Sequence, residues 1–512
     1  MFARTYGSTT QGVDGFIIDV EVDVSAGMPG TDIVGMPDTA VRESKERVRT
    51  AIKNSGIKYA PQKVTINLAP ADIKKDSSGL DLPMAIGLLI AHGVIKQESV
   101  EGAIFAAELS LEGELRGIHG ILPMTIKARE KGFKKIFLAT DNANEALLVE
   151  GIEVYAVRRL SELVDGLKGT GELSPMLPSD VGDDLPELTE DDFADVQGQF
   201  QAKRALEIAA AGGHNVLMVG SPGAGKTMLS RRFPSILPAM TRAEALEVTK
   251  IYSIAGLLSG GSGLITKRPF RSPHHTTSAT AIIGGGSVPR PGEVTLSHHG
   301  VLFLDELPEF SKQTLEVLRQ PIEDGKVTVS RVHASLTFPS QLILVAAMNP
   351  CPCGWQGDSS HACSCLPHEI KRYTRKISGP LLDRIDIHIR VPRVEYKELT
   401  AETKAESSAV IRERVTAARQ RQLERFSALG SNIYCNAQMN HAMLKKTCPL
   451  TPAAQNILAG FFAAKNLSAR SYDRIIKVGR TIADLAGAEC IGERHIAEAI
   501  QLRNDIGLDT DY

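Results

Sequence analysis

The chain has 512 residues, too many for one ordinary core, and this length suggests three domains of roughly 150 residues each. Its 58 basic and 60 acidic side chains give a formal net charge of -2, so any binding of nucleic acid requires locally clustered Lys and Arg. Seven cysteines, with neither a signal-type start nor an uninterrupted apolar stretch, argue against a disulfide-rich secreted protein and a membrane protein, and we expect a soluble, cytoplasmic one.

Residues 1–167 are predicted to form an independent α/β domain. Apolar residues alternate along 12–24 as in a strand, and a charged, capped segment follows that is typical of a helix. Further strands are predicted at 63–68, 114–118 and 135–139. Helices are predicted at 37–55, 81–91 and 123–131. The alternation of the two kinds of element indicates a mixed sheet-and-helix fold.

Residues 168–195 are predicted to be a linker. Between Gly171 and Asp195 there are nine acidic residues, three prolines and no Lys or Arg. This composition is typical of a solvated tether.

Residues 196–395 are predicted to form a parallel sheet with helices on both faces. A helix-like segment, GQFQAKRALEIAAAGG, precedes runs of Val, Ile and Leu at 216–219, 300–306, 341–347 and 386–391. Continuous apolar strands separated by helices indicate strands that are buried on both faces. After Pro392 the pattern becomes helical, so residues 396–512 are predicted to be a helical lid.

A glycine-rich loop follows the strand at 216–219 and has the pattern G-x-x-x-x-G-K-[ST]. Glycines allow backbone N–H groups to approach phosphates, the ammonium of Lys226 suits the β and γ oxygens, and the hydroxyl of Thr227 suits Mg²⁺. The strand before the loop and the helix after it favour this interpretation over a chance match, so the sequence predicts binding of ATP with Mg²⁺. The loop comprises Gly220, Ser221, Pro222, Gly223, Ala224, Gly225, Lys226 and Thr227.

Two carboxylates and an amide follow apolar strands further along the chain. Asp305 and Glu306 end the run VLFLDE, where open α/β sheets carry their active sites. Asp305 is predicted to hold Mg²⁺ together with Thr227, and Glu306 to polarise the attacking water. Asn349 ends another strand and is predicted to orient that water, although a strand-end Asn is otherwise most often a turn residue.

Five motifs together resemble the magnesium-chelatase-like AAA+ ATPases and, within that group, the competence protein ComM (YifB) family. In chain order they are GSPGAGKT, GVLFLDELPEF, AAMNPCPCG, ISGPLLDRIDIH and LSARSYDRIIKVGRTIADL. The resemblance covers nearly the whole chain. It implies a homohexameric ring, assembled with nucleotide and DNA, that hydrolyses ATP as a helicase on single-stranded and branched DNA. The implied role is branch migration in homologous recombination and natural transformation.

The same resemblance implies roles for two arginines. Arg384, in LLDRID, resembles the finger that reaches the γ-phosphate in a neighbouring subunit. Arg470, in LSAR, resembles the second sensor at the head of a lid helix. Without the motifs, a surface ion pair would be the preferred interpretation of both residues.

Two segments are predicted to carry hairpins that face the pore of the ring, as the resemblance implies. The first lies in 268–300 and the second in 323–338, where Asp324-Gly325 gives a turn signal. Lys326 and Arg331 are expected on one side of the second hairpin, together with His333, and are the predicted contacts to DNA phosphates. The alternative is that they are ordinary exposed charges.

Four cysteines lie directly after Asn349, as two C-x-C pairs around a nine-residue loop. They are Cys351, Cys353, Cys363 and Cys365. Four thiolates suit structural zinc, although the usual knuckle has two residues between paired cysteines. A reduced loop without metal and a redox-labile disulfide remain alternatives.

Two further groups receive no ligand assignment. Five arginines, at positions 412, 414, 419, 421 and 425, do not share one face and are predicted to lie on a solvated lid helix. The pairs His274-His275 and His298-His299 are expected to have structural or nucleotide-proximal roles, without a metal.

The first 167 residues resemble the Lon-protease-like fold through KDSSGLDLPMAIGLL and GELRGIHGILPMTIKAREKGFKKIFL. Lon proteases use a Ser and Lys dyad, because an amine activates the hydroxyl. Gly79 aligns with the serine and an apolar residue near Leu122 with the lysine, so we predict a non-proteolytic domain. Ser77 and Ser78 keep an ATP-dependent Lon-like protease as one alternative. The motor subunit of a metal chelatase, which requires a separate porphyrin-binding partner, is another.

Overall fold

The structure is a computed structural model, and it describes residues 1–58, 60, 62–73, 75, 77–177, 191–258, 263–286, 289–331, 334–358, 360–394, 405–465 and 468–504. The chain forms two compact units: 1–186 with 242–265, and 187–241 with 266–512. We had expected boundaries near 167, 195 and 395. The structure differs because one helix from the middle of the predicted second domain belongs to the first unit, and because the lid shares a core with the parallel sheet.

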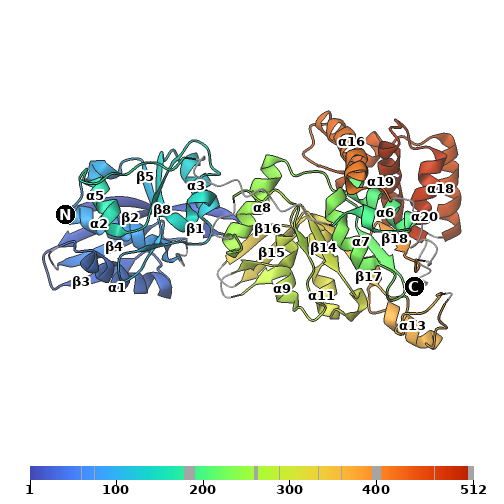
Figure 1. The fold of residues 1–512 in the computed structure, drawn as a ribbon, viewed down its shortest axis with the longest axis horizontal. Helices are drawn as coiled ribbons and strands as arrows, with labels where there is room; N and C mark the ends of the chain where they lie inside the picture. Colours follow the sequence, from blue (N-terminus) through green and yellow to red (C-terminus); the bar gives the residue numbers. More distant parts are fainter. Residues whose placement is uncertain are drawn as a thin grey trace. The chain divides into compact units, whose positions relative to one another are not determined.

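The first unit contains two main sheets (Figure 1). One has the order β1-β2-β4-β3, with antiparallel pairs except for the parallel pair of β3 and β4. Its strands are β1 (Phe2–Gln11), β2 (Asp14–Ser25), β3 (Gly30–Val34) and β4 (Lys63–Ala69). The other sheet is parallel, with the order β5 (Ala103–Ala106), β8 (Lys135–Ala139) and β9 (Glu153–Val157). The predicted strand at 114–118 is the short β7 (Leu115–Arg116), which pairs with β6 (Glu108–Leu109).

The predicted helices of the first unit lie close to their expected positions, as α1 (Thr39–Asn54), α2 (Asp81–Ala91) and α3 (Ile121–Glu130). Two further helices, α4 (Ala143–Ala146) and α5 (Leu160–Leu167), were not predicted. Every residue of α2 is buried, which agrees with its uniformly apolar sequence. These elements confirm the mixed α/β fold that was expected for this part of the chain.

Helix α8 (Arg242–Ala255) joins the first unit although it follows the phosphate loop in sequence. Leu246 packs against the apolar cluster that includes α3, and the backbone N–H of Gly120 donates to the carbonyl of Ser253 at 3.2 Å. The Ser253 hydroxyl donates to the buried carboxylate of Glu145. These contacts explain why 242–255 does not belong to the predicted ATPase domain.

A five-stranded parallel sheet forms the centre of the second unit, with the order β11-β14-β17-β10-β18. Its strands are β10 (Val216–Val219), β11 (Phe270–Arg271), β14 (Val301–Leu304), β17 (Ile343–Met348) and β18 (Ile387–Arg390). All residues of β10 and β14 are buried, as expected for strands covered on both faces. The predicted parallel sheet is therefore confirmed.

Shorter elements surround this sheet. The helices are α6 (Phe200–Gly212), α7 (Lys226–Arg232), α9 (Ala279–Ile283), α10 (Glu293–Leu296), α11 (Lys312–Val317), α12 (Arg319–Asp324), α13 (Pro367–Thr374) and α14 (Gly379–Leu382). Two hairpins pair β12 (Gly284–Gly285) with β13 (Arg290–Pro291), and β15 (Lys326–Arg331) with β16 (Ala334–Pro339). Both lie in the segments where hairpins were predicted.

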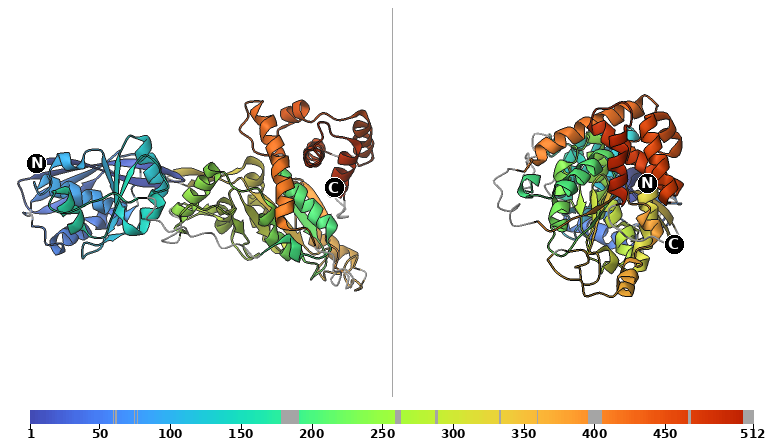
Figure 2. Two further views of the ribbon diagram at one scale, coloured as in Figure 1. Left: turned by 45° about the horizontal axis from the view of Figure 1, so that its top comes forward. Right: turned by 90° about the vertical axis from the view of Figure 1, so that its right-hand side faces the viewer.

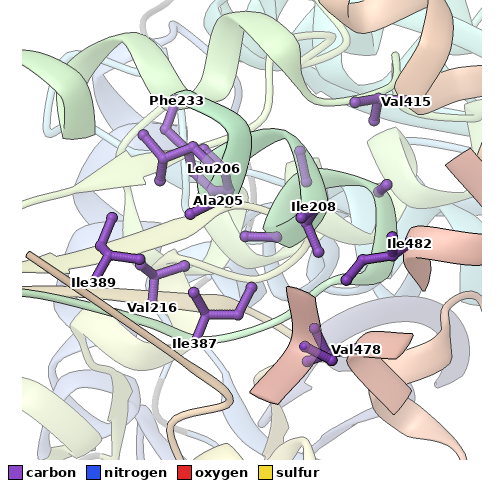
Figure 3. Close-up of a cluster of buried hydrophobic side chains, with 14 of the residues drawn as sticks. Ala205, Leu206, Ile208, Val216, Phe233, Ile387, Ile389, Val415, Val478 and Ile482 are labelled. Carbon is purple, nitrogen blue, oxygen red and sulfur yellow. The ribbon is translucent and has the colours of Figure 1, made fainter. Parts of the chain in front are cut away.

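The helical C-terminal part shares its core with the sheet. Its helices are α16 (Ser408–Ser427), α17 (His441–Thr447), α18 (Pro452–Lys465), α19 (Ala469–Leu485) and α20 (Glu493–Asn504). In Figure 2 the orange helix α16 lies against the green helix α6. Figure 3 shows Val478 and Ile482 of α19 close to Ile208 of α6 and Ile387 of β18. Burial of a common apolar surface therefore fixes the predicted lid to the sheet.

The end of the predicted linker is also part of this core. Phe193 is fully buried, and the carboxylate of Asp192 accepts from the N–H groups of Ala194 at 2.7 Å and Ser408 at 2.8 Å. The expectation of a solvated tether is wrong for 191–195, because the acidic composition concealed one apolar anchor and a capping carboxylate.

The five arginines of α16 each contact another residue of the unit, and two of them, Arg412 and Arg421, are exposed to solvent. Arg414 pairs with Glu207 at 2.6 Å, and Arg425 pairs with the buried Asp484. The other three donate to backbone carbonyls: Arg412 to Ser235, Arg419 to Ala210 and Arg421 to Asp484. The prediction of a solvated lid helix therefore holds for Arg412 and Arg421, whereas the other three arginines are half-buried and attach the helix to its neighbours.

Within the described residues, no helix has both the length and the apolar character needed to cross a bilayer.

Candidate active site

The glycine-rich loop connects β10 to α7 in a conformation that requires its glycines. Gly223 and Gly225 have φ angles of 78° and 88°, in the left-handed region that side chains disfavour. A Cβ atom at Gly220 would lie 2.3 Å from the carbonyl oxygen of Val391, which is closer than atoms can approach. The loop therefore has the compact geometry of the predicted phosphate cradle.

Lys226 is buried at the start of α7, and its ammonium lies across the loop. Its Nζ donates to the carbonyls of Gly220 at 2.6 Å and Ser221 at 3.0 Å, and to Oδ1 of Asn349 at 3.2 Å. Burial lowers the pKa of Lys226, whereas the carboxylates of Asp305 and Glu306 act in the opposite direction. A bound phosphate would compete with these three acceptors for the ammonium.

The two predicted Mg²⁺ ligands lie together. The Thr227 hydroxyl donates to Oδ2 of Asp305 at 2.8 Å, across the gap between α7 and the end of β14. A hydroxyl and a carboxylate are the oxygen ligands that Mg²⁺ prefers. The residues present therefore fit a site for this ion. Strand β17 is the direct neighbour of β14, as predicted, and ends one residue before Asn349.

Glu306 follows Asp305 in a left-handed backbone conformation, with a φ of 52°. Its side chain is about half exposed, and its Oε2 lies 3.3 Å from Nδ1 of His275. The His275 ring contacts the ring of His274, with centroids 4.1 Å apart, and faces the edge-on ring of Phe310 at a centroid distance of 6.5 Å. The sequence suggested a structural or nucleotide-proximal role for this histidine pair but did not indicate that His275 contacts Glu306, because that contact depends on the path of the chain after β11.

The two predicted arginines have different surroundings. Arg384 is largely buried, and its guanidinium donates to the Pro380 carbonyl at 2.7 Å and to the Glu323 carboxylate. Arg470 is exposed in the first turn of α19. Because both implied roles concern γ-phosphate and subunit contacts, they stay predictions.

A buried charge network joins the sheet to the lid close to Arg384. The carboxylate of Asp386 contacts Nδ1 of His214 at 3.2 Å and the guanidinium of Arg474, while Nε2 of His214 lies 2.8 Å from the Thr481 hydroxyl. Burial alone would raise the pKa of Asp386, but Arg474 and His214 hold it well below its usual range. No motif or spacing in the sequence indicated this network, because its residues are far apart along the chain.

The second hairpin lies where it was expected, but two details of the prediction are wrong. Gly325, with a φ of 63°, ends helix α12 instead of turning the hairpin. Positions 326 and 331 differ by an odd number, so they do not share a face of β15. Lys326 is exposed, whereas the side chain of Arg331 and the whole of His333 lie outside the described part of the structure.

The four cysteine sulphurs converge after Asn349. The Sγ atom of Cys353 lies 3.3 Å from that of Cys351 and 3.6 Å from that of Cys363, and all four Sγ atoms lie within 4.8 Å of one another. These separations are far longer than the S–S bond of about 2.05 Å, so the disulfide alternative does not describe this structure.

The Lon-like part of the chain lacks the corresponding chemistry at the aligned positions. A Cβ atom at Gly79 would lie 2.4 Å from Cδ1 of Ile118, and Leu122 is fully buried. The Ser77 hydroxyl accepts from the N–H of Gly79 at 3.1 Å. Lys75 is buried nearby in sequence, but its ammonium donates to the carbonyls of Gly35 and Pro70.

Comparisons with known proteins identify the family. Three family descriptions match: "Magnesium chelatase, subunit ChlI" at residues 192–399, "Subunit ChlI of Mg-chelatase" at 20–142 and "Magnesium chelatase, subunit ChlI C-terminal" at 405–503. The Competence protein ComM of Haemophilus influenzae is 41% identical over 507 residues, covering 98% of this chain and 97% of that protein. The YifB protein of Escherichia coli is 42% identical over 494 residues, covering 96% and 95%. The chain belongs to the ComM/YifB family of magnesium-chelatase-like proteins.

Membership of the ComM/YifB family agrees with the geometry. The fold combines a Lon-like α/β region with an AAA+ parallel sheet and a helical C-terminal part, and Lon protease 2 of Bacillus subtilis is 26% identical over 168 residues, 30% of each chain. The site therefore belongs to an ATPase of the ComM/YifB type, for which ATP and Mg²⁺ are the expected substrate and cofactor.

Proposed function

We propose that this protein is a cytoplasmic, ATP-driven ring motor that acts on DNA and promotes branch migration during homologous recombination and natural transformation. One observation carries the proposal: the contacts of Lys226 with Asn349 and of Thr227 with Asp305 lie in a chain that resembles a Competence protein ComM over nearly its whole length. Contacts of a motor with DNA phosphates do not depend on base sequence, which suits movement along a strand.

In the proposed reaction each side chain has one task. Lys226 binds the β and γ phosphate oxygens, and Thr227 and Asp305 hold Mg²⁺, which neutralises developing charge when bound. Glu306 accepts a hydrogen bond from the attacking water and so polarises its O–H bond. Asn349 orients that water from the adjacent strand. The contact of Glu306 with His275 holds the carboxylate near the start of the first hairpin segment.

We further propose that ATP lies between the subunits of a homohexamer. Arg384 would then reach the γ-phosphate of the neighbouring subunit after leaving Glu323, and Arg470 would act as the second sensor of the nucleotide. Hydrolysis at an interface changes that interface, which allows a ring to move a strand. The exposed Lys326 is the favoured contact of the second hairpin with phosphate, and zinc in the cysteine loop is a further proposal.

The test is ATP hydrolysis by the full chain with Mg²⁺, with and without single-stranded and four-way-junction DNA. We expect DNA to stimulate turnover, and the stimulation to fall as salt rises, because phosphate contacts release counterions. The Lys226→Ala variant serves as the inactive control. Turnover that is unaffected by any DNA at low salt would contradict the proposal.

The two alternative functions have less support. A Lon-like protease needs a nucleophile and an amine, and Gly79 and Leu122 provide neither at the aligned positions. A chelatase motor requires a porphyrin-binding partner, so activity of the isolated chain on DNA distinguishes it from the proposed motor. Casein cleavage that disappears in Ser78→Ala would instead restore the protease hypothesis.

A further inference from the structure

The separations of the cysteine sulphurs match those of one tetrahedral metal ion. A Zn–S bond of about 2.3 Å places the sulphurs of a tetrahedral site roughly 3.8 Å apart. Three of the observed separations are 3.3, 3.6 and 3.7 Å, and the fourth sulphur lies within 4.8 Å of the others. An iron–sulphur cluster would hold the cysteines further apart, because its iron and sulphide atoms lie between them. The spacing therefore favours a single ion over a cluster.

The backbone around these sulphurs has the arrangement expected of metal-bound thiolates. The N–H of Cys353 donates to Sγ of Cys365 and the N–H of Gln356 donates to Sγ of Cys351, both at 3.3 Å. Such bonds fix the orientation of metal-bound thiolates and stabilise their negative charge. Gly354 and Gly357, with φ angles of 86° and 77°, allow the tight turns that bring these N–H groups to the sulphurs.

The same loop packs directly against the phosphate loop. A Cβ atom at Gly354 would lie 2.7 Å from the ring of Pro222, so the two backbones are in close contact. The carboxylate of Asp358 forms hydrogen bonds with Ser360 and with the hydroxyl of Ser221, which lower its pKa. A cavity of about 460 Å³ beside the phosphate loop is lined by residues 219–221, 356–358 and 390–394. The position of the cysteine loop thus shapes one wall of the nucleotide-binding region.

We propose that Cys351, Cys353, Cys363 and Cys365 bind one Zn²⁺, and that this ion holds the loop against Pro222 and Ser221, so that nucleotide affinity depends on the metal. Zinc replaces the thiol protons without any change of oxidation state. Zinc suits the site because it forms tetrahedral sites with four thiolates and is not redox active. The proposal concerns nucleotide binding alone and does not require action on DNA.

The first test measures the metal content of the full chain by elemental mass spectrometry, after purification without added chelator. We expect about one zinc ion per chain in the wild type. In the double variant Cys363→Ser/Cys365→Ser we expect the zinc content to be lower by at least about tenfold. Cys490→Ser is the matched control, because Cys490 is exposed and outside the cluster, and it should keep the zinc. Wild-type protein that carries iron, or no metal after purification from zinc-supplemented cells, would overturn the proposal.

The second test measures binding of a fluorescent, non-hydrolysable ATP analogue in the absence of DNA. We expect roughly tenfold weaker binding after zinc is removed by a chelator, with recovery when Zn²⁺ is returned. Unchanged affinity of protein verified to lack zinc would contradict the coupling. Failure of DNA stimulation would leave this result unaffected, so the two proposals fail separately.

A variant that keeps all four ligands guards against simple misfolding. Gly354→Ala places a methyl group against Pro222 at a φ of 86°. We expect it to retain zinc and to bind the ATP analogue several-fold more weakly. Wild-type affinity in Gly354→Ala would show that this contact does not transmit the effect.

Discussion

The phosphate-loop region and the Lon-like region of this chain have similar α/β building blocks but differ in their chemistry. In the first, a lysine, a hydroxyl, a carboxylate and an amide from three separated segments lie within 3.2 Å of one another in pairs: Lys226 with Asn349, and Thr227 with Asp305. In the second, the aligned nucleophile position is a glycine packed against Ile118, and the aligned amine position lies near the buried Leu122. A fold is therefore retained through its packing, whereas an activity requires particular side chains at particular places.

The largest effect is expected for Lys226→Ala. Loss of the ammonium removes the charge that faces the β and γ phosphates, so we expect ATP hydrolysis to fall by about 10³-fold and nucleotide binding to weaken. Steady-state hydrolysis and binding of a fluorescent analogue measure both effects. Lys312→Ala, an exposed lysine of α11, is the control for charge and should keep normal turnover. A normal rate of ATP hydrolysis in Lys226→Ala would show that the phosphate-loop region does not carry the activity that distinguishes it from the Lon-like region.

A somewhat smaller loss is expected for Glu306→Gln. The amide keeps the size of the side chain but cannot accept a proton, so we expect turnover to fall about 10²-fold while ATP remains bound. Glu309→Gln is the matched control, since this carboxylate lies three residues further on and pairs with Lys376 at 3.2 Å. Single-turnover hydrolysis with retained nucleotide distinguishes the two variants. If Glu306→Gln hydrolysed ATP at the wild-type rate, the assignment of the carboxylate would be wrong.

The third prediction concerns the buried charges that hold the second unit together. Asp386→Asn leaves Arg474 without its buried partner, and we expect a loss of about 3–5 kcal/mol of unfolding free energy. Asp383→Asn, a half-exposed carboxylate 3.7 Å from Arg503, should cost less than about 1 kcal/mol. Urea unfolding followed by circular dichroism measures both. Equal costs would show that the network contributes no special stability.

This network also predicts a pH dependence. Because the folded pKa of Asp386 is lowered, its stabilising contribution is complete above the unfolded value of about 3.9 and is lost as the pH falls below it. Asp386→Asn should therefore show a smaller decline in stability than the wild type between pH 5 and pH 3, in the same urea assay. Parallel declines would contradict this assignment.

The Lon-like region provides a fourth prediction. Gly79→Ser restores a hydroxyl at the aligned position but forces Ile118 to move, so we expect a destabilisation of about 1–3 kcal/mol and no cleavage of casein. Gly263→Ser, where an added Cβ atom meets open space, is the control for stability. Cleavage by Gly79→Ser would show that the region retains more of the proteolytic machinery than its packing indicates.

The smallest effect is expected at the hairpin. Lys326→Ala should lower DNA-stimulated turnover about threefold at moderate salt and leave basal turnover unchanged, since one phosphate contact contributes modestly. Lys446→Ala, an exposed lysine of α17, carries the same loss of charge and should have no effect. Equal loss of basal and stimulated turnover in Lys326→Ala would indicate a defect of folding or assembly instead.

The sequence predicted the elements of the fold that depend on neighbouring residues and missed those that depend on distant ones. The strand at 216–219 and the glycine loop lie in one short segment, so both followed from neighbouring residues. Strand β3 and the placement of α8 did not, because they depend on pairing with distant segments. Phe193 was hidden in an acidic stretch, and only its burial revealed an anchor.

In the candidate site, the strand-end residues were predictable from the sequence, whereas the partners of the loop residues were not. The positions of Asp305 and Asn349 followed from strand ends, since neighbouring parallel strands bring their carboxyl ends together. The partners of His275 and Arg384 depend on loops and helices whose path the sequence does not reveal. The shared face proposed for Lys326 and Arg331 was an error of periodicity, because an odd separation puts two strand residues on opposite faces.

Coupling of ATP hydrolysis to movement of DNA is tested by measuring hydrolysis and the conversion of a mobile four-way DNA junction in the same reaction, with the full chain, ATP and Mg²⁺. We expect junction conversion to proceed only while ATP is hydrolysed, and to be absent in Lys226→Ala and Glu306→Gln. Rapid hydrolysis by the wild type with an unchanged junction, at salt concentrations where the protein binds that junction, would contradict the central claim.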